Sequence, residues 1–126
     1  MLLDTHALIW FLDDDPKLPS IVKERIEASS LVFVSIASLW EIAIKLGLGK
    51  LNFQFQFEEI PAFLEQLDIV VLSITFSDVE CYLKQPLHHR DPFDRMLIAQ
   101  AINNSLTIIS QDAQFDAYSI QRVWSC

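Results

Sequence analysis

Glycine is scarce in this chain of 126 residues, which contains only Gly47 and Gly49. A dinucleotide-binding fingerprint and a Walker phosphate-binding loop both need glycines at fixed spacings that these two residues cannot supply. The G-x-S-x-G turn of one large class of serine hydrolases is also absent. The common nucleotide-binding enzymes and that class of serine hydrolase are therefore excluded.

Cysteine is equally rare, since only Cys81 and Cys126 occur. Neither belongs to a C-x-x-C pair or to a Cys/His array with zinc spacing, so we expect reduced thiols without a structural metal. No apolar run approaches the roughly 20 residues that a membrane-spanning helix needs. The chain also begins without a basic leader and a small-residue cleavage site. We therefore expect a soluble, cytoplasmic protein that makes no contact with a membrane.

Positive charge is limited, with 9 Lys and Arg against 17 Asp and Glu and a net charge of −8. This balance opposes general binding to nucleic acid, because phosphate contacts require local Lys and Arg. The difficulty is smaller if several carboxylates bind a divalent ion, which changes the local sign of the charge. A basic partner is the other inference that the charge allows.

Apolar residues are abundant, at 52% of the chain with 11% aromatic residues, which is typical of a compact protein. The length suits a single domain over residues 1–126. Short apolar runs alternate with segments of helical periodicity, which predicts an α/β fold with a parallel sheet and helices on both faces. Strands are expected at 1–3, 31–35, 69–72, 107–110 and 120–124, and helices at 5–12, 20–28, 37–46, 58–67, 77–84 and 92–104.

A connector over residues 47–57 carries Phe53, Phe55 and Phe57 at alternate positions. Alternation predicts a short edge strand or a hairpin arm, although an exposed apolar patch for a partner remains open. Two helix starts are also indicated by capping residues. Ser20 is expected to cap one helix, and Ser77 with Glu80 forms the pattern of a capping box at another.

Four acidic residues lie at strand-to-helix junctions or near helix starts. Asp4 follows the first apolar run, Glu41 lies on a helix that is apolar nearly all round, and Asp112 follows the strand expected at 107–110. Asp94 lies in the first turn of a helix that Asp91 is expected to cap. Parallel strands gather their carboxyl ends at one edge of a sheet, where such folds bind ligands. Carboxylates collected there repel one another unless a hard cation such as Mg²⁺ joins them.

Each acid also has a purely structural explanation. Asp4 and Asp112 are good helix caps, and Glu41 is spaced to form a capping box with Ser38 and an ion pair with Lys45. Separate explanations are then needed for separate residues, whereas one shared cation accounts for the whole set. The catalytic and metal-binding residues are therefore predicted to be Asp4, Glu41, Asp94 and Asp112.

Four segments carry a likeness to a known family. They are LLDTHALIWFL, SLWEIAIKLGLGKL, DPFDRMLIAQA and LTIISQDAQFDAY. In order, they resemble the motifs of PIN-domain ribonucleases, and most of all the VapC toxins of bacterial toxin-antitoxin pairs. The likeness extends from residue 2 to about residue 118, and DPFDR is its most specific part.

The resemblance implies a Rossmann-like α/β/α sandwich around a parallel sheet, with Mg²⁺ or Mn²⁺ held by the four acids. It further implies an RNA substrate, a VapB-like antitoxin and a homodimer. Thr5 is then expected to hold a water molecule at the site, and Arg95 to contact a substrate phosphate. Weaker candidates for phosphate contacts are Lys45, His88, His89 and Arg90, and candidates for protein contacts are Trp10, Phe11, Phe53 and Phe55.

The predicted reaction is hydrolysis of RNA, in which an activated water attacks the phosphorus in line while the cation stabilises the developing charge. A haloacid-dehalogenase-like phosphatase also begins with an Asp after its first strand, but it needs a second Asp where this chain has His6. The remaining alternative is a non-catalytic PIN-like module that binds RNA or protein. Intact carboxylates weigh against it, because acids placed beside phosphate do not help binding alone.

Overall fold

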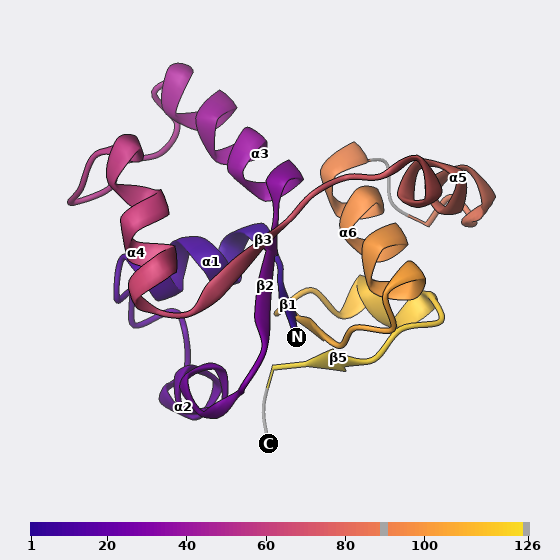
Figure 1. Cartoon of the computed structure of the whole chain (residues 1–126), viewed down its shortest axis with the longest axis horizontal. Coiled ribbons are helices and arrows are strands. Elements are labelled where there is room, and N and C mark those ends of the chain that lie inside the picture. The colour runs from indigo at the N-terminus through magenta and orange to yellow at the C-terminus, as the bar shows by residue number, and fades with distance from the viewer. Residues whose placement is uncertain (89–90, 125–126) are drawn as a thin grey trace.

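The computed structural model describes residues 1–88 and 91–124 and contains a sheet of five parallel strands (Figure 1). The strand order is β3-β2-β1-β4-β5, so β1 lies at the centre and the chain moves outward from it in both directions. This order confirms the predicted α/β class. The strands are β1 Leu2–Leu3, β2 Val32–Ser35, β3 Ile69–Leu72, β4 Ile108–Ile109 and β5 Arg122–Val123.

Helices connect the strands and cover both faces of the sheet, with α1, α2 and α4 on one side in Figure 1 and α5 and α6 on the other. Within the described residues no helix is long and apolar enough to cross a bilayer. The helices are α1 Thr5–Leu12, α2 Ser20–Ala28, α3 Ile36–Gly47, α4 Ile60–Gln66, α5 Phe76–Lys84 and α6 Pro92–Asn103, with short 3₁₀ helices η1 Phe57–Glu59 and η2 Ala113–Ala117.

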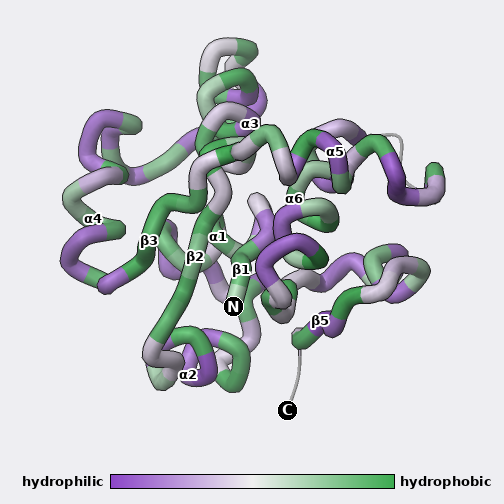
Figure 2. The backbone as a smooth tube through the Cα atoms, turned by 45° about the vertical axis from the view of Figure 1, so that its right-hand side comes forward, coloured by the Kyte–Doolittle hydropathy of each residue, from purple (hydrophilic) through white to green (hydrophobic). Residues whose placement is uncertain are grey.

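Two apolar clusters lie on opposite faces of the sheet, because successive side chains of a strand point to opposite sides. Leu3 and Ile109 pack with residues of α1, α2 and α4, whereas Leu2 and Ile108 pack with residues of α6. Figure 2 shows the central strands as continuously hydrophobic segments, as expected for strands buried on both faces. The molecule is thus the three-layered α/β/α arrangement that the sequence predicts.

The phenylalanine connector forms no strand, so the prediction of an edge strand or hairpin arm is wrong. Phe53, Phe55 and Phe57 are half-buried and their polar neighbours are exposed, so burial alternates although no strand pairs with this segment. The rings of Phe53 and Phe55 stack with centroids 4.6 Å apart, and Phe55 meets Phe63 of α4 edge-on at 5.1 Å. The alternation of half-buried and exposed side chains therefore arises from packing against α4.

Helix caps also differ from the prediction. The cap of α5 is Thr75 with Asp78, because the same Thr/Ser-x-x-acid pattern occurs two residues before Ser77. The cap of α2 is Pro19, without a side-chain hydrogen bond. The cap of α3 is Ser35, whose hydroxyl accepts from the Ala37 amide, so Ser38 lies inside that helix and forms no capping box.

Asp78 joins α5 to α6. The carboxylate is buried and accepts from the Thr75 amide at 3.0 Å and from Asn103 Nδ2 at 2.8 Å. Gln100 Nε2, which is on α6, donates to the same carboxylate at 3.5 Å. Because α5 presents much of its surface to solvent, these bonds from one side chain hold it in place.

Asp78→Ala should lower the free energy of unfolding by about 2–3 kcal/mol, because it removes a helix cap and the buried acceptor through which Asn103 and Gln100 hold α5 to α6. Urea denaturation followed by circular dichroism measures this change. Glu24→Ala, at an exposed site on α2, is the control and should change stability by less than about 0.5 kcal/mol. Equal stability of the two variants would contradict this role of Asp78.

Candidate active site

The register of the central strands brings two of the predicted acids together. β1 pairs with β4 so that Leu3 is opposite Ile109, and the Asp4 amide donates to the Ile109 carbonyl at 3.0 Å. Asp4 therefore follows β1 at the same edge of the sheet where Ser110 and Asp112 follow β4. Parallel pairing thus brings residues that are about a hundred positions apart in the sequence close together in space.

Asp4 is buried and caps α1, with its Oδ1 accepting from the Ala7 amide at 2.8 Å. Burial raises the pKa of the Asp4 carboxyl, against hydrogen bonds from Ser110 and Ala7 and the charge of His6. The nearby charge of Asp112 raises this pKa further. Asp4 is thus an acid that the fold has removed from water and placed beside another acid.

Asp112 caps the short helix η2, because its Oδ1 accepts from the Gln114 amide at 2.9 Å. The Asp112 amide donates to the Ser110 hydroxyl at 3.0 Å. Ser110 is fully buried and also forms the hydrogen bond to Asp4. One hydroxyl therefore sets the spacing between Asp4 and Asp112.

Glu41 enters the site from α3, which starts directly after β2. The residue is buried, and its Oε2 lies 3.2 Å from Lys45 Nζ, as the i, i+4 spacing predicts. Its other oxygen, Oε1, is buried and has no hydrogen-bond partner among the described residues. A buried carboxylate oxygen without a partner is costly, so this atom needs a ligand.

Asp94 connects the whole set electrostatically. Asp91 caps α6, as predicted, with its Oδ1 accepting from the Phe93 amide at 2.8 Å and the Asp94 amide at 3.2 Å. Burial and, to a smaller extent, the charges of four nearby acids together raise the pKa of the Asp94 carboxyl to about 7. In decreasing order these acids are Asp91, Glu41, Asp4 and Asp112. All four predicted site residues thus interact through Asp94.

The acids open onto a cleft of about 340 Å³ at the carboxyl edge of the sheet. Asp4, Asp94 and Asp112 line this cleft, and Glu41 acts on it from α3 through its charge on Asp94. The other lining residues are His6, Trp10, Gln111, Ala113 and Phe115.

A divalent cation fits this donor set. Among residues 1–88 and 91–124, no three His, Cys, Asp or Glu side chains have the spacing of a ready metal cage. Mg²⁺ does not require one, since it usually keeps several waters and is held by one or two carboxylates. The unpartnered Oε1 of Glu41 and the raised pKa of Asp94 show an excess of negative charge that a hard cation would relieve.

Two further predicted residues have other contacts in the structure. Thr5 is buried and its hydroxyl donates to Ser38 Oγ at 3.0 Å, which joins α1 to α3 next to the acids. The Arg95 guanidinium lies 4.6 Å from the Tyr82 ring centroid and donates to the Tyr82 carbonyl at 3.1 Å. Arg95 therefore holds α5 against α6, and its contact with a substrate phosphate stays a prediction.

The weaker candidates for phosphate contacts are also accounted for. Lys45 is paired with Glu41, and the His88 ring meets the Tyr118 ring edge-on at 5.0 Å. His89 and Arg90 lie outside the described residues. Among the candidates for protein contacts, Phe11 is buried in the core. Phe53 and Phe55 pack at its border.

Sequence reasoning missed Ser110, His6 and Gln111 as neighbours of the acids. The signal for Ser110 was its position directly after a strand, opposite Asp4 in a parallel pair. The signal for His6 was its spacing of four residues from Trp10, which places both rings on one face of α1. Gln111 gave no such signal, because its exposed side chain lies in an irregular turn.

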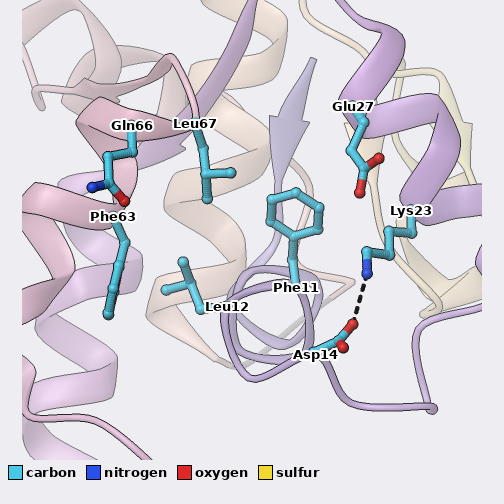
Figure 3. Close-up of a pocket in the computed structure, with 8 residues that line it drawn as sticks. All are labelled: Phe11, Leu12, Asp14, Lys23, Glu27, Phe63, Gln66 and Leu67. Atoms are coloured by element: carbon cyan, nitrogen blue, oxygen red, sulfur yellow. Dashed lines mark hydrogen bonds and ion pairs between the residues drawn. The ribbon is translucent and has the colours of Figure 1, made fainter.

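A separate groove of about 320 Å³ lies between α1, α2 and α4 (Figure 3). Phe11, Leu12, Phe63 and Leu67 contribute apolar surface to it. Lys23 is bound to Asp14 at 2.7 Å, as Figure 3 shows, so this charge is largely neutralised. None of the four predicted acids lines this groove, which therefore suits contact with another molecule better than catalysis.

Comparison with known families identifies the class of protein. The profile of the PIN domain matches residues 1–121, and the chain belongs to this family. A search of curated proteins found no match.

Solved structures share the fold at low sequence identity. The chain resembles a chain of FitAcB from Neisseria gonorrhoeae with a TM-score of 0.66 and 21% identity, covering 96% of this chain and 94% of that one. It resembles a chain of VapBC2 from Rickettsia felis, bound to a promoter DNA fragment, with a TM-score of 0.73 and 14% identity, covering 97% of this chain and 96% of that one. It also resembles a chain of a FitAB complex bound to the IR36 DNA fragment, with a TM-score of 0.67 and 19% identity, covering 99% of this chain and 96% of that one.

The stability of the protein should fall as pH rises from about 4 to 7 in the presence of a chelator. The pKa of Asp94 is higher in the folded chain, at about 7 against 3.8, so the folded state binds more protons in this window. Asp94→Asn should make stability less dependent on pH in this window and should raise the melting temperature at pH 8. Asp91→Asn keeps the cap but removes the neighbouring charge, so it should give an intermediate slope.

Differential scanning calorimetry at several pH values measures these slopes. Adding Mn²⁺ at pH 8 should raise the melting temperature of the wild-type chain by linkage and have a smaller effect on Asp94→Asn. An equal dependence of the melting temperature on pH in the wild type and in Asp94→Asn would contradict the raised pKa of the Asp94 carboxyl.

Proposed function

We propose that this chain is an endoribonuclease that depends on Mg²⁺ or Mn²⁺ and acts in the cytoplasm as the toxin of a toxin-antitoxin pair. The observation that carries the proposal is the position of Asp4, Asp94 and Asp112 along one cleft, with the buried Oε1 of Glu41 unpartnered among the described residues. Acids gathered beside one cleft, with such an oxygen among them, would bind a divalent metal. Membership of the PIN domain family supports phosphodiester chemistry at this site.

Asp4, Asp94, Asp112 and Glu41 are the residues that would hold the cation. A bound Mg²⁺ or Mn²⁺ supplies a Lewis acid, lowers the pKa of water and orients a phosphodiester for in-line attack. Asp4 and Asp112 are fixed for this purpose by their capping bonds and by Ser110. Lys45 balances one oxygen of Glu41 and leaves Oε1 for a ligand.

A PIN-like module that binds RNA or protein without cleaving it is the second candidate. The lack of a ready three-residue cage within the described part of the chain favours it. The buried, unpartnered oxygen of Glu41 opposes it, because a binding surface has no need of such an atom. Cleavage assays separate the two candidates.

Asp4→Asn and Asp94→Asn should each reduce divalent-dependent RNA cleavage by at least about 100-fold, since each removes one charge that stabilises the reacting centre. The assay follows total cellular RNA with Mn²⁺, and growth arrest after induced expression is the second readout. Glu65→Gln, at an exposed site on α4, should keep full activity. Cleavage at the wild-type rate by both Asn variants would leave the non-catalytic candidate in place.

A VapB-like antitoxin is the proposed partner, in line with the toxin-antitoxin complexes among the structural neighbours. The groove of Figure 3 has apolar surface from Phe11, Phe63 and Leu67, with exposed Glu27 at its side. A partner helix with apolar residues and a basic group fits this chemistry. The net charge of −8 favours a basic partner over the whole surface.

A homodimer is also part of the proposal. Helix α5 exposes Phe76, Val79 and Leu83 along one face, at 78%, 47% and 82% exposure, and Leu87 follows them at 73%. Residues at spacings of three and four lie on one side of a helix, so they form a continuous apolar stripe. An apolar stripe matches itself in a second copy about a two-fold axis.

Leu83→Glu should convert the dimer to a monomer, because it places two like charges in a desolvated contact. Its fold should remain intact, since Leu83 is almost fully exposed in the isolated chain. Size-exclusion chromatography with light scattering measures the mass. Ile21→Glu, at an exposed apolar site on α2, is the control and should remain dimeric. A monomeric wild-type chain would refute the assignment.

A further inference from the structure

Aromatic rings from both ends of the chain meet beside the acidic cleft. His6 and Trp10 both line the cleft and lie one helical turn apart on α1, with ring centroids 5.7 Å apart and planes tilted by 36°. Trp124, which follows β5, meets Trp10 edge-on at 5.8 Å and 61°. The cleft thus has carboxylates from three elements and a ring surface from α1.

Core packing explains only part of this arrangement. Trp10 and Trp124 pack against the buried cluster of the α1 face, so both contribute to stability. His6 is exposed, and its imidazole forms no hydrogen bond within the described residues. A ring held against Trp10 at the mouth of the cleft, without a role in the core, is available to a bound molecule.

The charges around the cleft determine which part of a nucleic acid these rings contact. Arg95 is buried against Tyr82, Lys45 is paired with Glu41, and Arg122 donates to Asp116. These cations are therefore engaged by the protein itself and are poorly placed to hold phosphates. The neutral face of a base remains, and stacking on aromatic rings is favourable for every base.

We propose that His6 and Trp10, braced by Trp124, form a stacking platform for an unpaired base that flanks the scissile phosphate. The proposal rests on the proposed ribonuclease function and extends it by naming the substrate class. A base within a duplex has both faces covered by its neighbours, whereas a base in a loop or single strand can be splayed onto a ring. The platform therefore selects single-stranded segments of RNA.

The test uses a short single-stranded RNA that the wild-type chain cuts at one bond. Abasic nucleotides are placed one at a time on either side of that bond, and kcat/KM is measured with Mn²⁺. One abasic position should reduce kcat/KM of the wild type by on the order of 10-fold, which corresponds to the loss of one stacked base. The variants are Trp10→Leu, which keeps apolar volume against the core, and Trp10→Phe, which keeps a flat ring.

Trp10→Leu should cut the intact RNA about 10-fold more slowly and should be insensitive to the abasic position. Trp10→Phe should retain that sensitivity. A purely structural role of Trp10 would instead slow both RNAs equally, and this result would overturn the platform. Thermal melting checks that each variant is folded.

His6→Leu gives an independent result, because His6 is exposed and outside the core. It should weaken the effect of the abasic position, and any change in the melting temperature reports the lost charge beside Asp4. Cleavage by the wild type with no abasic effect at any position would refute the platform and leave the ribonuclease function intact. Absence of cleavage by the wild type would remove both.

Discussion

Repulsion among carboxylates at one edge of a parallel sheet is the constraint on which this molecule depends. The sheet brings Asp4 and Asp112 together through the pairing of β1 with β4, and α3 and α6 add Glu41 and Asp94. Their mutual repulsion costs stability, as the pKa of about 7 at Asp94 indicates, although Lys45 pairs with Glu41 and Ala7 donates to Asp4. A fold that keeps such an arrangement does so for a ligand, because stability alone would favour removing the charges.

Capping and metal binding are compatible uses of the same carboxylate. Asp4 and Asp112 each place one oxygen on a backbone amide of the following helix. At Asp4, the hydrogen bond from the Ala7 amide lowers the pKa and partly offsets the effect of burial. In a parallel sheet every strand that leads into a helix ends at this edge, so capping acids gather there by topology. The structural and functional explanations of these residues therefore coincide.

The sequence predicted the sheet, the helices and the gathering of the acids at one edge of the sheet, because these depend on local patterns and one topological rule. It failed where a pattern has two physical causes. The alternation of Phe53 and Phe55 arises from packing against α4, since no strand lies beside them. Arg95 follows Asp94 directly but contacts Tyr82 of α5, because adjacent helical residues point about 100° apart. Which neighbour a residue meets depends on tertiary packing.

The acidic character of the chain is consistent with a nuclease of narrow substrate range. Without a cation, the carboxylates of the cleft repel a phosphate backbone, and paired cations such as Lys45 and Arg122 add little attraction. If the chain is the proposed nuclease, its affinity for RNA depends on the metal and on contacts with the bases, both of which are local to the cleft. A basic surface would instead bind any RNA through its backbone. The charge balance thus fits the proposal that only segments able to reach both the rings and the metal are bound.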